Sequence, residues 1–271
     1  MSRISQDLHP VLIETANEMA AAARAAILPY FRNPELMADN KDEEGFDPVT
    51  EADRAAEAAM RHVLQHRRPM DSIFGEEMGQ HEGDSGLTWV LDPIDGTRGF
   101  LSGTPTWGVL IALSDQDGPV MGIVDQPYIG ERFFGGFGQA YCDGPVGRRS
   151  LHVRKGVTLE EAILFSTFPE VGSVDEGRAF RNLAKRVKLV RYGMDCYAYA
   201  LLAAGQIDLV VEAGLNAYDI QGPQAVIEAA GGIVTDWNGG PAHNGGRIIA
   251  AASEEIHAAA LELLHDGLAT I

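Results

Sequence analysis

The sequence predicts an α/β fold in two packed halves, residues 1–150 and residues 151–271. Two observations lead to this prediction. The first half contains short apolar runs that alternate with period two between Gly-containing turns, a pattern typical of an antiparallel sheet. The second half alternates strand-like and helix-like segments, which is typical of an α/β arrangement around a mixed sheet. With 271 residues, of which 45% are hydrophobic and 22% charged, the chain can bury a large core.

The chain carries a formal net charge of −18, which restricts its partners. An acidic surface repels nucleic acids and anionic membranes, so we expect neither as a partner. No apolar run approaches the ~18 residues of a membrane span, and the acidic start of the chain lacks the apolar core of a signal peptide. Two cysteines indicate a reducing compartment without a disulfide framework. We therefore expect a cytoplasmic protein.

Two helices are predicted near the amino terminus. Apolar residues recur at helical spacing over residues 8–31. Thr50 followed by Asp53 is a helix-capping pair, and the helix that it opens should end before Pro69. Between these helices, residues 40–47 are polar and acidic, which is typical of an exposed loop. Closure of this loop over a metal site is the functional alternative.

The strands of the first half are predicted to be short. A strand that begins at Trp89 should break at Pro93, because proline cannot donate a backbone hydrogen bond. Residues 81–86 should form a loop. Further strands of this half are expected at residues 73–77, 106–113, 120–124, 132–134 and 140–144.

Beyond a boundary near residues 151–158, strands are predicted to alternate with helices. Pro223 lies within one of these helices, where it should kink the helix unless it falls in the first turn. The strands are expected at residues 163–165, 188–190, 207–211, 233–235 and 248–252, and the helices at residues 175–187, 195–204, 219–230 and 254–264.

The chemistry is expected where the strand that begins at Trp89 ends, in the sequence Asp-Pro-Ile-Asp-Gly-Thr at residues 92–97. A tight turn here, for which Gly96 gives the backbone freedom, brings two carboxylates, a hydroxyl and free carbonyls together. Mg²⁺ prefers such oxygen ligands, with room left for water and phosphate. A plain β-turn is the structural alternative, since Asp, Pro and Gly are common turn residues.

Other acidic motifs accompany this hexapeptide. An acidic segment lies at residues 47–53, Gly-Glu-Glu at residues 75–77, and Tyr-Asp at residues 218–219 precedes Ala-Ala-Gly-Gly at residues 229–232. Together, and in this order, the motifs resemble the inositol monophosphatase family of Mg²⁺-dependent, lithium-sensitive phosphatases. The resemblance covers most of the chain, although the family usually has Trp at the position of Tyr218.

Two further segments narrow the resemblance. Arg-Gly-Phe at residues 98–100 and Arg-Tyr-Gly-Met-Asp-Cys-Tyr at residues 191–197 are most similar to the histidinol-phosphate phosphatases of this superfamily. The resemblance implies a layered α-β-α-β-α architecture, two or more Mg²⁺ ions per site and a homodimer. It also implies that the reacting partner is a small phosphorylated metabolite.

The resemblance assigns a role to each acidic residue in the hydrolysis of a phosphate monoester, in which metal-activated water attacks phosphorus. Asp47 would accept a hydrogen bond from the Thr97 hydroxyl, and the two would orient or deprotonate the water. Glu76 is the third residue of this catalytic set. The backbone amides of Gly96 and Thr97 would hold the phosphate. The metal ligands would be Glu76, Asp92, the Ile94 carbonyl, Asp95 and Asp219.

Substrate choice is expected to come from the second half. Asp195 stands where many inositol phosphatases have a small apolar residue, and a carboxylate there suits the ammonium group of histidinol. A helix N-cap is the structural alternative for Asp195. Glu212, at the end of a predicted strand, is the second candidate, and Arg191 either contacts the substrate or lies on the surface. The predicted substrate-binding set also contains Gly96, Thr97 and Asp219.

The leading functional hypothesis is a Mg²⁺-dependent phosphatase that acts on L-histidinol phosphate in histidine biosynthesis. The nearest alternatives keep the chemistry and change the substrate to inositol monophosphate, a 3′-phosphoadenosine nucleotide or fructose 1,6-bisphosphate. An alternative of another class is a non-catalytic relative with a regulatory or scaffolding role. The complete acidic set argues against this last alternative, because a non-catalytic copy has no chemical reason to keep it.

Overall fold

The computed structural model describes residues 4–36, 38–40 and 48–269. Its helices are α1 (His9–Ile27), α2 (Glu51–Arg67), α3 (Thr97–Ser102), α4 (Val174–Ala184), α5 (Asp195–Ala203), α6 (Ala217–Ala229) and α7 (Glu254–Ala269), with short 3-10 helices η1 (Gln6–Leu8) and η2 (Leu159–Glu161). The strands of the first half are β1 (Ala38–Asn40), β2 (Pro48–Thr50), β3 (Ser72–Gly75), β4 (Gly79–His81), β5 (Thr88–Asp95), β6 (Gly108–Asp115), β7 (Gly118–Gln126), β8 (Glu131–Gly136), β9 (Gln139–Gly144) and β10 (Gly147–Ser150). Those of the second half are β11 (Ile163–Ser166), β12 (Leu189–Tyr192), β13 (Leu209–Leu215), β14 (Ile233–Asp236) and β15 (Gly246–Ala251).

Two large sheets organise the molecule. The eight-stranded sheet has the order β10-β9-β8-β7-β6-β5-β3-β4, and the five-stranded sheet has the order β12-β11-β13-β15-β14. Only the β3–β5 pair is parallel in the first sheet, whereas the second sheet is mixed. Strand order therefore agrees with an antiparallel first half and an α/β second half. The exact domain division at residue 150 stays a prediction, although β10 ends there.

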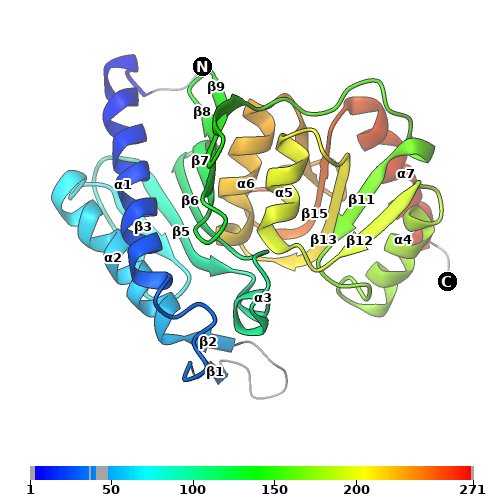
Figure 1. The fold of residues 1–271 in the computed structure, drawn as a ribbon. Coiled ribbons are helices and arrows are strands. Elements are labelled where there is room, and N and C mark those ends of the chain that lie inside the picture. Colours follow the sequence, from blue (N-terminus) through cyan, green and yellow to red (C-terminus); the bar gives the residue numbers. More distant parts are fainter. Residues whose placement is uncertain (1–3, 37, 41–47, 270–271) are drawn as a thin grey trace.

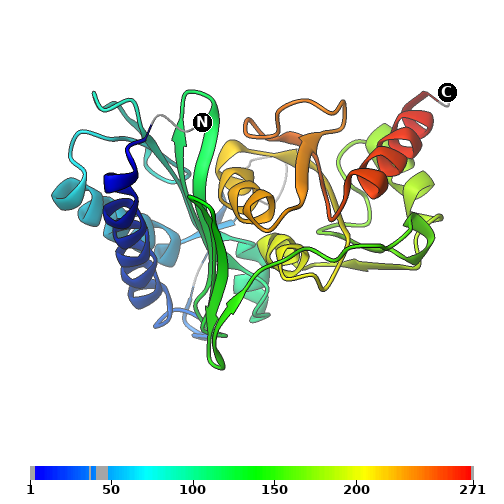
Figure 2. The same cartoon turned by 90° about the horizontal axis from the view of Figure 1, so that it is seen from above.

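The layers follow one another across the molecule as helix, sheet, helix, sheet, helix (Figure 1 and Figure 2). Helices α1 and α2 cover the outer face of the eight-stranded sheet, α5 and α6 lie between the sheets, and α4 and α7 cover the five-stranded sheet. Three hydrophobic clusters of described residues fill the spaces between these layers. The predicted α-β-α-β-α architecture is confirmed.

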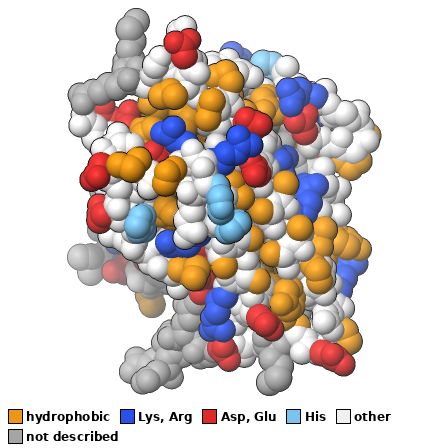
Figure 3. Space-filling model, turned by 90° about the vertical axis from the view of Figure 1, so that its left-hand side faces the viewer, with side chains coloured by type: hydrophobic (Ala, Val, Ile, Leu, Met, Phe, Trp, Pro, Cys, Tyr) orange, Lys and Arg blue, Asp and Glu red, His pale blue; other side chains and the backbone are white. Residues whose placement is uncertain are grey.

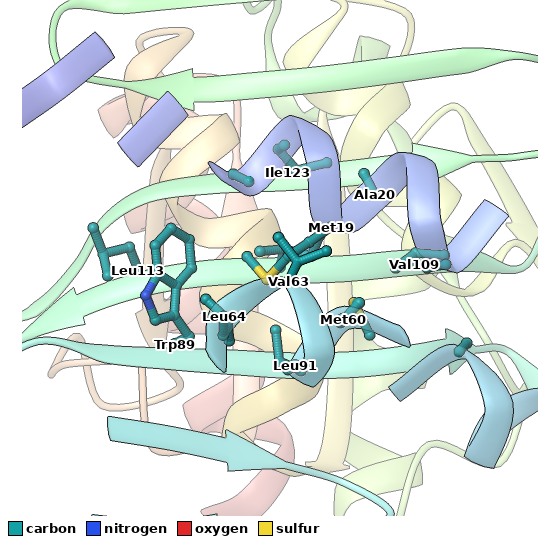
Figure 4. Close-up of a cluster of buried hydrophobic side chains, with 14 of the residues drawn as sticks. Met19, Ala20, Met60, Val63, Leu64, Trp89, Leu91, Val109, Leu113 and Ile123 are labelled. Carbon is teal, nitrogen blue, oxygen red and sulfur yellow. The ribbon is translucent and has the colours of Figure 1, made fainter. Parts of the chain in front are cut away.

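The core under α1 and α2 follows from the alternation of the strands. Met19 of α1 and Met60 of α2 meet the sheet side chains Trp89 and Val109 in one cluster (Figure 4). Leu110, the next residue along β6, points into the cluster between the two sheets. Strand β6 is thus buried on both faces, and its sequence is almost wholly apolar for that reason.

The outer face of α1 and α2 mixes charged, histidine and hydrophobic side chains (Figure 3). Arg67 of α2 forms ion pairs with Glu14 and Glu18 of α1, at 3.4 Å and 2.7 Å. Such exposed pairs contribute little stability, so the apolar stripe underneath holds these helices on the sheet. Among the described residues, no helix is long and apolar enough to cross a membrane.

The start of α2 agrees with the capping prediction. The Thr50 hydroxyl accepts a hydrogen bond from the Ala52 backbone at 3.1 Å, and the Asp53 carboxylate accepts one from the Thr50 backbone at 2.8 Å. Residues 41–47, which contain most of the predicted loop, lie outside the described residues.

The prediction that Pro93 breaks its strand was wrong. Strand β5 continues to Asp95, because the pairing with β6 shifts its register instead of ending. Asp92 pairs with Leu110 and Asp95 pairs with Gly108, so the first strand has one more residue than the second between these pairs. An irregularity of this kind accommodates a proline that cannot donate to the ladder.

Several short elements were not predicted from the sequence, including β1, β2, α3, β4 and β10. Helix α3 begins directly after Gly96, strand β10 extends the sheet edge, and β4 includes His81, which was expected in a loop. Both strands are only three or four residues long and fully exposed, so neither shows an alternation of buried and exposed residues.

Helix α6 packs unusually close to the eight-stranded sheet. A Cβ at Gly122 of β7 would overlap the Gly222 backbone, and a Cβ at Gly135 of β8 would overlap the backbone at Val226. Because α6 begins at Ala217, Pro223 lies beyond its first turn, yet the helix continues to Ala229. This contact of backbone on backbone fixes α6 relative to β7 and β8.

Candidate active site

A cavity of about 270 Å³ opens where the two halves meet. It collects the ends of β3, β5 and β13 and the starts of α3, α5 and α6. Its lining residues are Glu76, Asp92, Ile94, Asp95, Gly96, Thr97, Arg98, Phe168, Asp195, Gly214, Asn216, Tyr218 and Asp219. Most of the residues predicted for the site therefore lie around one cavity.

Strand pairing places Glu76 beside Asp92. Strands β3 and β5 are parallel, with Gly75 opposite Leu91, and the Glu76 backbone N–H donates to the Leu91 carbonyl at 3.1 Å. Glu76 follows Gly75 directly, and Asp92 follows Leu91. These two acids are 16 positions apart in the sequence but lie next to each other at the carboxyl ends of neighbouring strands.

Backbone amides hold the carboxylates of β5. Asp92 Oδ1 accepts from the Ile94 backbone at 3.0 Å, and Asp95 Oδ2 accepts from the Cys196 backbone at 2.6 Å. The Thr97 hydroxyl donates to the Ile94 carbonyl at 3.1 Å. Gly96 has a φ of 84°, a left-handed conformation that glycine adopts without strain, and it caps α3. The turn predicted from the sequence is therefore present.

Asp219 reaches the same point from the second half. It lies in the first turn of α6, where its Oδ2 accepts from the Asn216 backbone at 2.6 Å. Tyr218 packs edge-on against Phe74 of β3, with 5.9 Å between ring centroids. An aromatic residue other than tryptophan thus forms the contact between the halves at this position.

Asp92, Asp95 and Asp219 form a cluster suited to a cation. Each offers one carboxylate oxygen, and these oxygens lie within 4.8 Å of one another. Burial, followed by repulsion from Glu76 and the other aspartates, raises the pKa of Asp92 well above its ordinary value. Burial and the charges of Asp195 and Asp219 likewise raise the pKa of Asp95. A divalent cation would relieve this repulsion, so the donor set fits Mg²⁺.

Helix starts add a positive potential to the acidic cavity. The amino-terminal ends of α3, α5 and α6 all contribute residues to the lining. Free N–H groups and the helix dipole favour anions at such ends. The cavity therefore combines acids that can hold cations with amides that can hold a phosphate.

Asp195 faces the cavity and does not cap α5. The residue before Asp195 forms no side-chain hydrogen bond to this helix. The Cys196 backbone N–H donates to the Asp95 carboxylate instead. Asp195 has a φ of 44°, which is unusual for a residue with a side chain. A Cβ at Gly96 would lie 2.9 Å from the Asp195 carboxyl carbon, so the side chain rests on the turn at Gly96. Burial raises the pKa of Asp195 to about 6, whereas a weak Thr106 hydrogen bond and the Arg98 charge lower it.

Glu212 and Arg191 are not among the described residues that line the cavity. Glu212 is buried, and its Oε1 accepts from the Thr167 backbone at 2.6 Å and from the Thr167 hydroxyl at 2.9 Å. Burial raises its pKa to about 7, against these hydrogen bonds. Arg191 is exposed on β12, at the edge of the five-stranded sheet. A direct contact of either residue with substrate stays a prediction.

Asp47 lies outside the described residues, so its predicted bond with Thr97 is untested. Asp53, which the sequence assigned only a capping role, is a buried carboxyl on the same side of the fold. Burial raises its pKa to about 6, and the Glu77 charge adds to the rise. Its burial could not be predicted from a capping pair, because caps usually lie on the surface.

Two further residues near the site, Phe168 and Tyr199, were not predicted. Phe168 lines the cavity, and the Arg98 guanidinium lies over its ring at 5.0 Å from the centroid. Tyr199 of α5 is buried, and its hydroxyl has no hydrogen-bond partner among the described residues. Burial, then the charges of Glu212 and Asp95, raises its pKa. Only tertiary contacts reveal these residues, since none belongs to a sequence motif.

Known proteins share the sequence and the fold. The model of the inositol monophosphatase family matches residues 8–269. An Arabidopsis thaliana protein named bifunctional phosphatase IMPL2, chloroplastic, is 38% identical over 259 residues, which are 92% of this chain and 73% of that protein. A Streptomyces coelicolor protein named histidinol-phosphatase is 33% identical over 255 residues, which are 90% of this chain and 93% of that protein.

Solved structures give the same result. The structure of an inositol monophosphatase from Zymomonas mobilis has a TM-score of 0.84 and 37% sequence identity, and the match covers 97% of this chain and 100% of that chain. The acidic motifs, the layered fold and these similarities agree, and the chain belongs to the inositol monophosphatase family.

Proposed function

We propose that this protein is a Mg²⁺-dependent phosphatase that hydrolyses L-histidinol phosphate. Its family and the names of its relatives identify it as a phosphoric monoester hydrolase, and the substrate and the metal are our inference. One observation carries the choice of substrate: the Asp195 carboxylate faces the cavity beside the turn that would hold the phosphate.

The chemistry of histidinol phosphate suits this placement. Its ammonium group is on the carbon next to the one that carries the phosphate ester, so the two charged groups are close together. A phosphate on the Gly96 and Thr97 amides would bring the ammonium close to Asp195, which rests on Gly96. A charge-assisted hydrogen bond in a half-buried site is a strong contact. An inositol ring has no charge that would use it.

Glu76, Asp92, the Ile94 carbonyl, Asp95 and Asp219 would hold the metal ions, and all of them line the cavity. Bound Mg²⁺ would neutralise the phosphate charge and increase the acidity of water. Without a cation these carboxylates repel one another, and the repulsion contributes to the raised pKa values of Asp92 and Asp95. This repulsion supports the assignment.

The other residues of the site would position the reactants. The amides at the start of α3 would bind the phosphate, and the amino-terminal end of α6 adds a favourable dipole. The Thr97 hydroxyl, which in this structure donates to the Ile94 carbonyl, would orient the attacking water together with Asp47. Hydrolysis of this kind depends mainly on positioning and charge neutralisation.

Inositol monophosphate is the second candidate substrate, and one observation favours it. The Arg98 charge acts on Asp195 and lowers its pKa, so Arg98 can neutralise Asp195 without help from a substrate. A cavity neutralised in this way would accept an uncharged polyol. The structural relative from Zymomonas mobilis is an inositol monophosphatase.

The proposal includes a homodimer, which the resemblance of the sequence motifs to the family implies, and a role in histidine biosynthesis, which the name of the Streptomyces coelicolor relative suggests. It also includes the cytoplasm, because Cys142 and Cys196 are both free thiols. Sedimentation velocity at several protein concentrations would test the dimer.

The deciding experiment measures phosphate release from L-histidinol phosphate and inositol 1-phosphate in parallel, with Mg²⁺ and with EDTA. We expect a strong Mg²⁺-dependent preference for histidinol phosphate. A preference for inositol phosphate would keep the metal site and refute the role of Asp195. No release from either would direct the search to nucleotide and sugar phosphates, and then to a non-catalytic role.

A further inference from the structure

A buried ion pair lies directly behind the metal-binding end of β3. Glu57 of α2 has an exposed fraction of 0%, and its Oε1 accepts from Arg61 Nε at 2.7 Å. Neither residue lines the cavity or belongs to a motif of the site. We propose that Glu57 is a positioning residue that fixes the turn carrying Glu76, and so sets the affinity of the site for divalent cations.

The contacts of Glu57 cover the whole turn between β3 and β4. Its Oε2 accepts from the Glu77 backbone at 2.7 Å, and its Oε1 accepts from the Met78 backbone at 3.1 Å. The Arg61 guanidinium, held by Glu57, donates to the Gly79 carbonyl. One ion pair therefore satisfies the polar backbone atoms of three successive residues.

Gly75 confirms how close this contact is. A Cβ at this position would overlap Glu57 Oε1 and would lie 2.8 Å from the Arg61 guanidinium. The φ of Gly75 is not in the left-handed region, so its backbone conformation does not require glycine. Glycine is needed here because the carboxylate of Glu57 occupies the space of a side chain.

Glu76 is consequently held from both sides. On one side its own N–H donates to the Leu91 carbonyl of β5, and on the other the next two N–H groups donate to Glu57. A short turn with an acidic side chain would otherwise move to reduce the repulsion from Asp92. Groups that orient a metal ligand typically change metal affinity by about 10- to 100-fold when removed.

This inference rests on the proposed function, because it requires that the acids bind a divalent cation. The test is Mn²⁺ binding to the substrate-free protein, measured by isothermal titration calorimetry and by the EPR signal of free Mn²⁺. Glu57→Gln keeps the size of the side chain and places an amide against one of the two N–H groups. We expect it to weaken Mn²⁺ binding about tenfold.

The matched control is Asp71→Asn, at the opposite end of the same strand. Asp71 is 2% exposed, pairs with Arg68 at 2.7 Å and accepts from the Trp89 indole at 2.9 Å. It is a buried ion pair of the same kind, but among the described residues the bonding partners of its side chain are Arg68 and Trp89 and not the turn. We expect this variant to lower the melting temperature as Glu57→Gln does and to change Mn²⁺ affinity less than twofold.

Gly75→Ala gives a second, independent perturbation, because the added methyl displaces Glu57 without removing it. It should weaken Mn²⁺ binding in the same direction as Glu57→Gln. Wild-type affinity in either folded variant, or equal losses in Glu57→Gln and Asp71→Asn, would overturn the inference while leaving the proposed function intact. If the wild-type protein itself binds no Mn²⁺, the proposed metal centre fails, and this inference fails with it.

Discussion

The Asp95 carboxylate of β5 accepts the backbone N–H of Cys196 at the start of α5, at 2.6 Å. A residue of the first half thus caps a helix of the second half. This bond has a direct consequence for Asp195, which precedes Cys196. Asp195 is released from the capping role that its position suggests, and its side chain lies over Gly96 at the edge of the cavity.

Asp195→Ala should separate the two leading substrates. If the carboxylate binds the ammonium group, kcat/KM for L-histidinol phosphate should fall by roughly 100-fold, the value of a charge-assisted hydrogen bond. Hydrolysis of p-nitrophenyl phosphate, which has no ammonium group, should change by no more than about threefold. Asp195→Asn, which keeps the shape, serves as the control. An equal fall for both substrates would contradict the specificity argument.

Mg²⁺ should stabilise the folded protein, and more so at pH 8 than at pH 5.5. Protons bind Asp92 and Asp95 more readily in the fold because their pKa values are raised, and a cation must displace them at low pH. Saturating metal at 100 times its dissociation constant adds about 2.7 kcal/mol. Thermal melts of EDTA-treated protein with added Mg²⁺ measure the effect. Asp219→Asn should reduce it, and a larger shift at pH 5.5 would refute the mechanism.

Glu212→Gln should change how stability depends on pH. Burial raises the folded pKa of Glu212 from 4.5 to about 7, so the unfolded chain loses this proton at lower pH than the folded protein. The free energy of unfolding of the wild type therefore falls as pH rises from 4.5 to 7, by up to about 3 kcal/mol. The variant lacks this contribution. Urea unfolding at pH 5 and pH 8 in EDTA compares the two, and parallel pH profiles would disprove the assignment.

Double-mutant cycles can identify the carboxylate that acts together with Thr97 in hydrolysis. We expect Asp53→Asn to couple with Thr97→Ala in kcat, because Asp53 is buried beside Glu77 with a pKa of about 6. Losses that simply add would leave Asp53 as a cap worth about 1 kcal/mol of stability. The same cycle with Asp47→Asn is the comparison. Coupling there instead would support the assignment made from the sequence.

Tyr199→Phe should stabilise the protein by about 1 kcal/mol, since an unpaired buried hydroxyl costs free energy. The values of kcat and KM should remain within about twofold of the wild type, as the hydroxyl does not line the cavity. Chemical unfolding of both proteins gives the difference. A loss of stability would show that the hydroxyl is bonded in solution, with an internal water as the partner.

The turn and the helix start that position the site could be predicted, because each depends on residues that are close in the sequence. Turn residues fix the chain between Asp92 and Thr97, and a capping pair starts α2 at Thr50. Alternating patterns were sufficient for the long strands, such as β6 and β7, and for the division into an antiparallel and a mixed sheet. Each of these features depends on residues that are close in sequence.

The remaining features depend on contacts between distant segments. The sequence cannot show that Pro93 is absorbed by a register shift, because the shift belongs to the pairing of β5 with β6. The sequence alone did not decide whether Asp195 caps a helix or binds the substrate. The residue that caps this helix, Asp95, is 100 residues earlier in the chain. The role of Glu57 could not be predicted from the sequence for the same reason. Its partners in the turn at Glu77 become its neighbours only when α2 packs on the sheet.

The glycine contact between Gly122 and Gly222 has a consequence for engineering. The distance between α6, which carries Asp219, and the eight-stranded sheet is limited by two backbones in contact, so exchanges of side chains elsewhere need not disturb it. Phe168 and Asp195, which also line the cavity, belong to segments outside this contact. Libraries confined to those segments should therefore yield phosphatases with new substrate preferences. Replacement of Gly122 or Gly222 by alanine should instead abolish hydrolysis of every substrate alike.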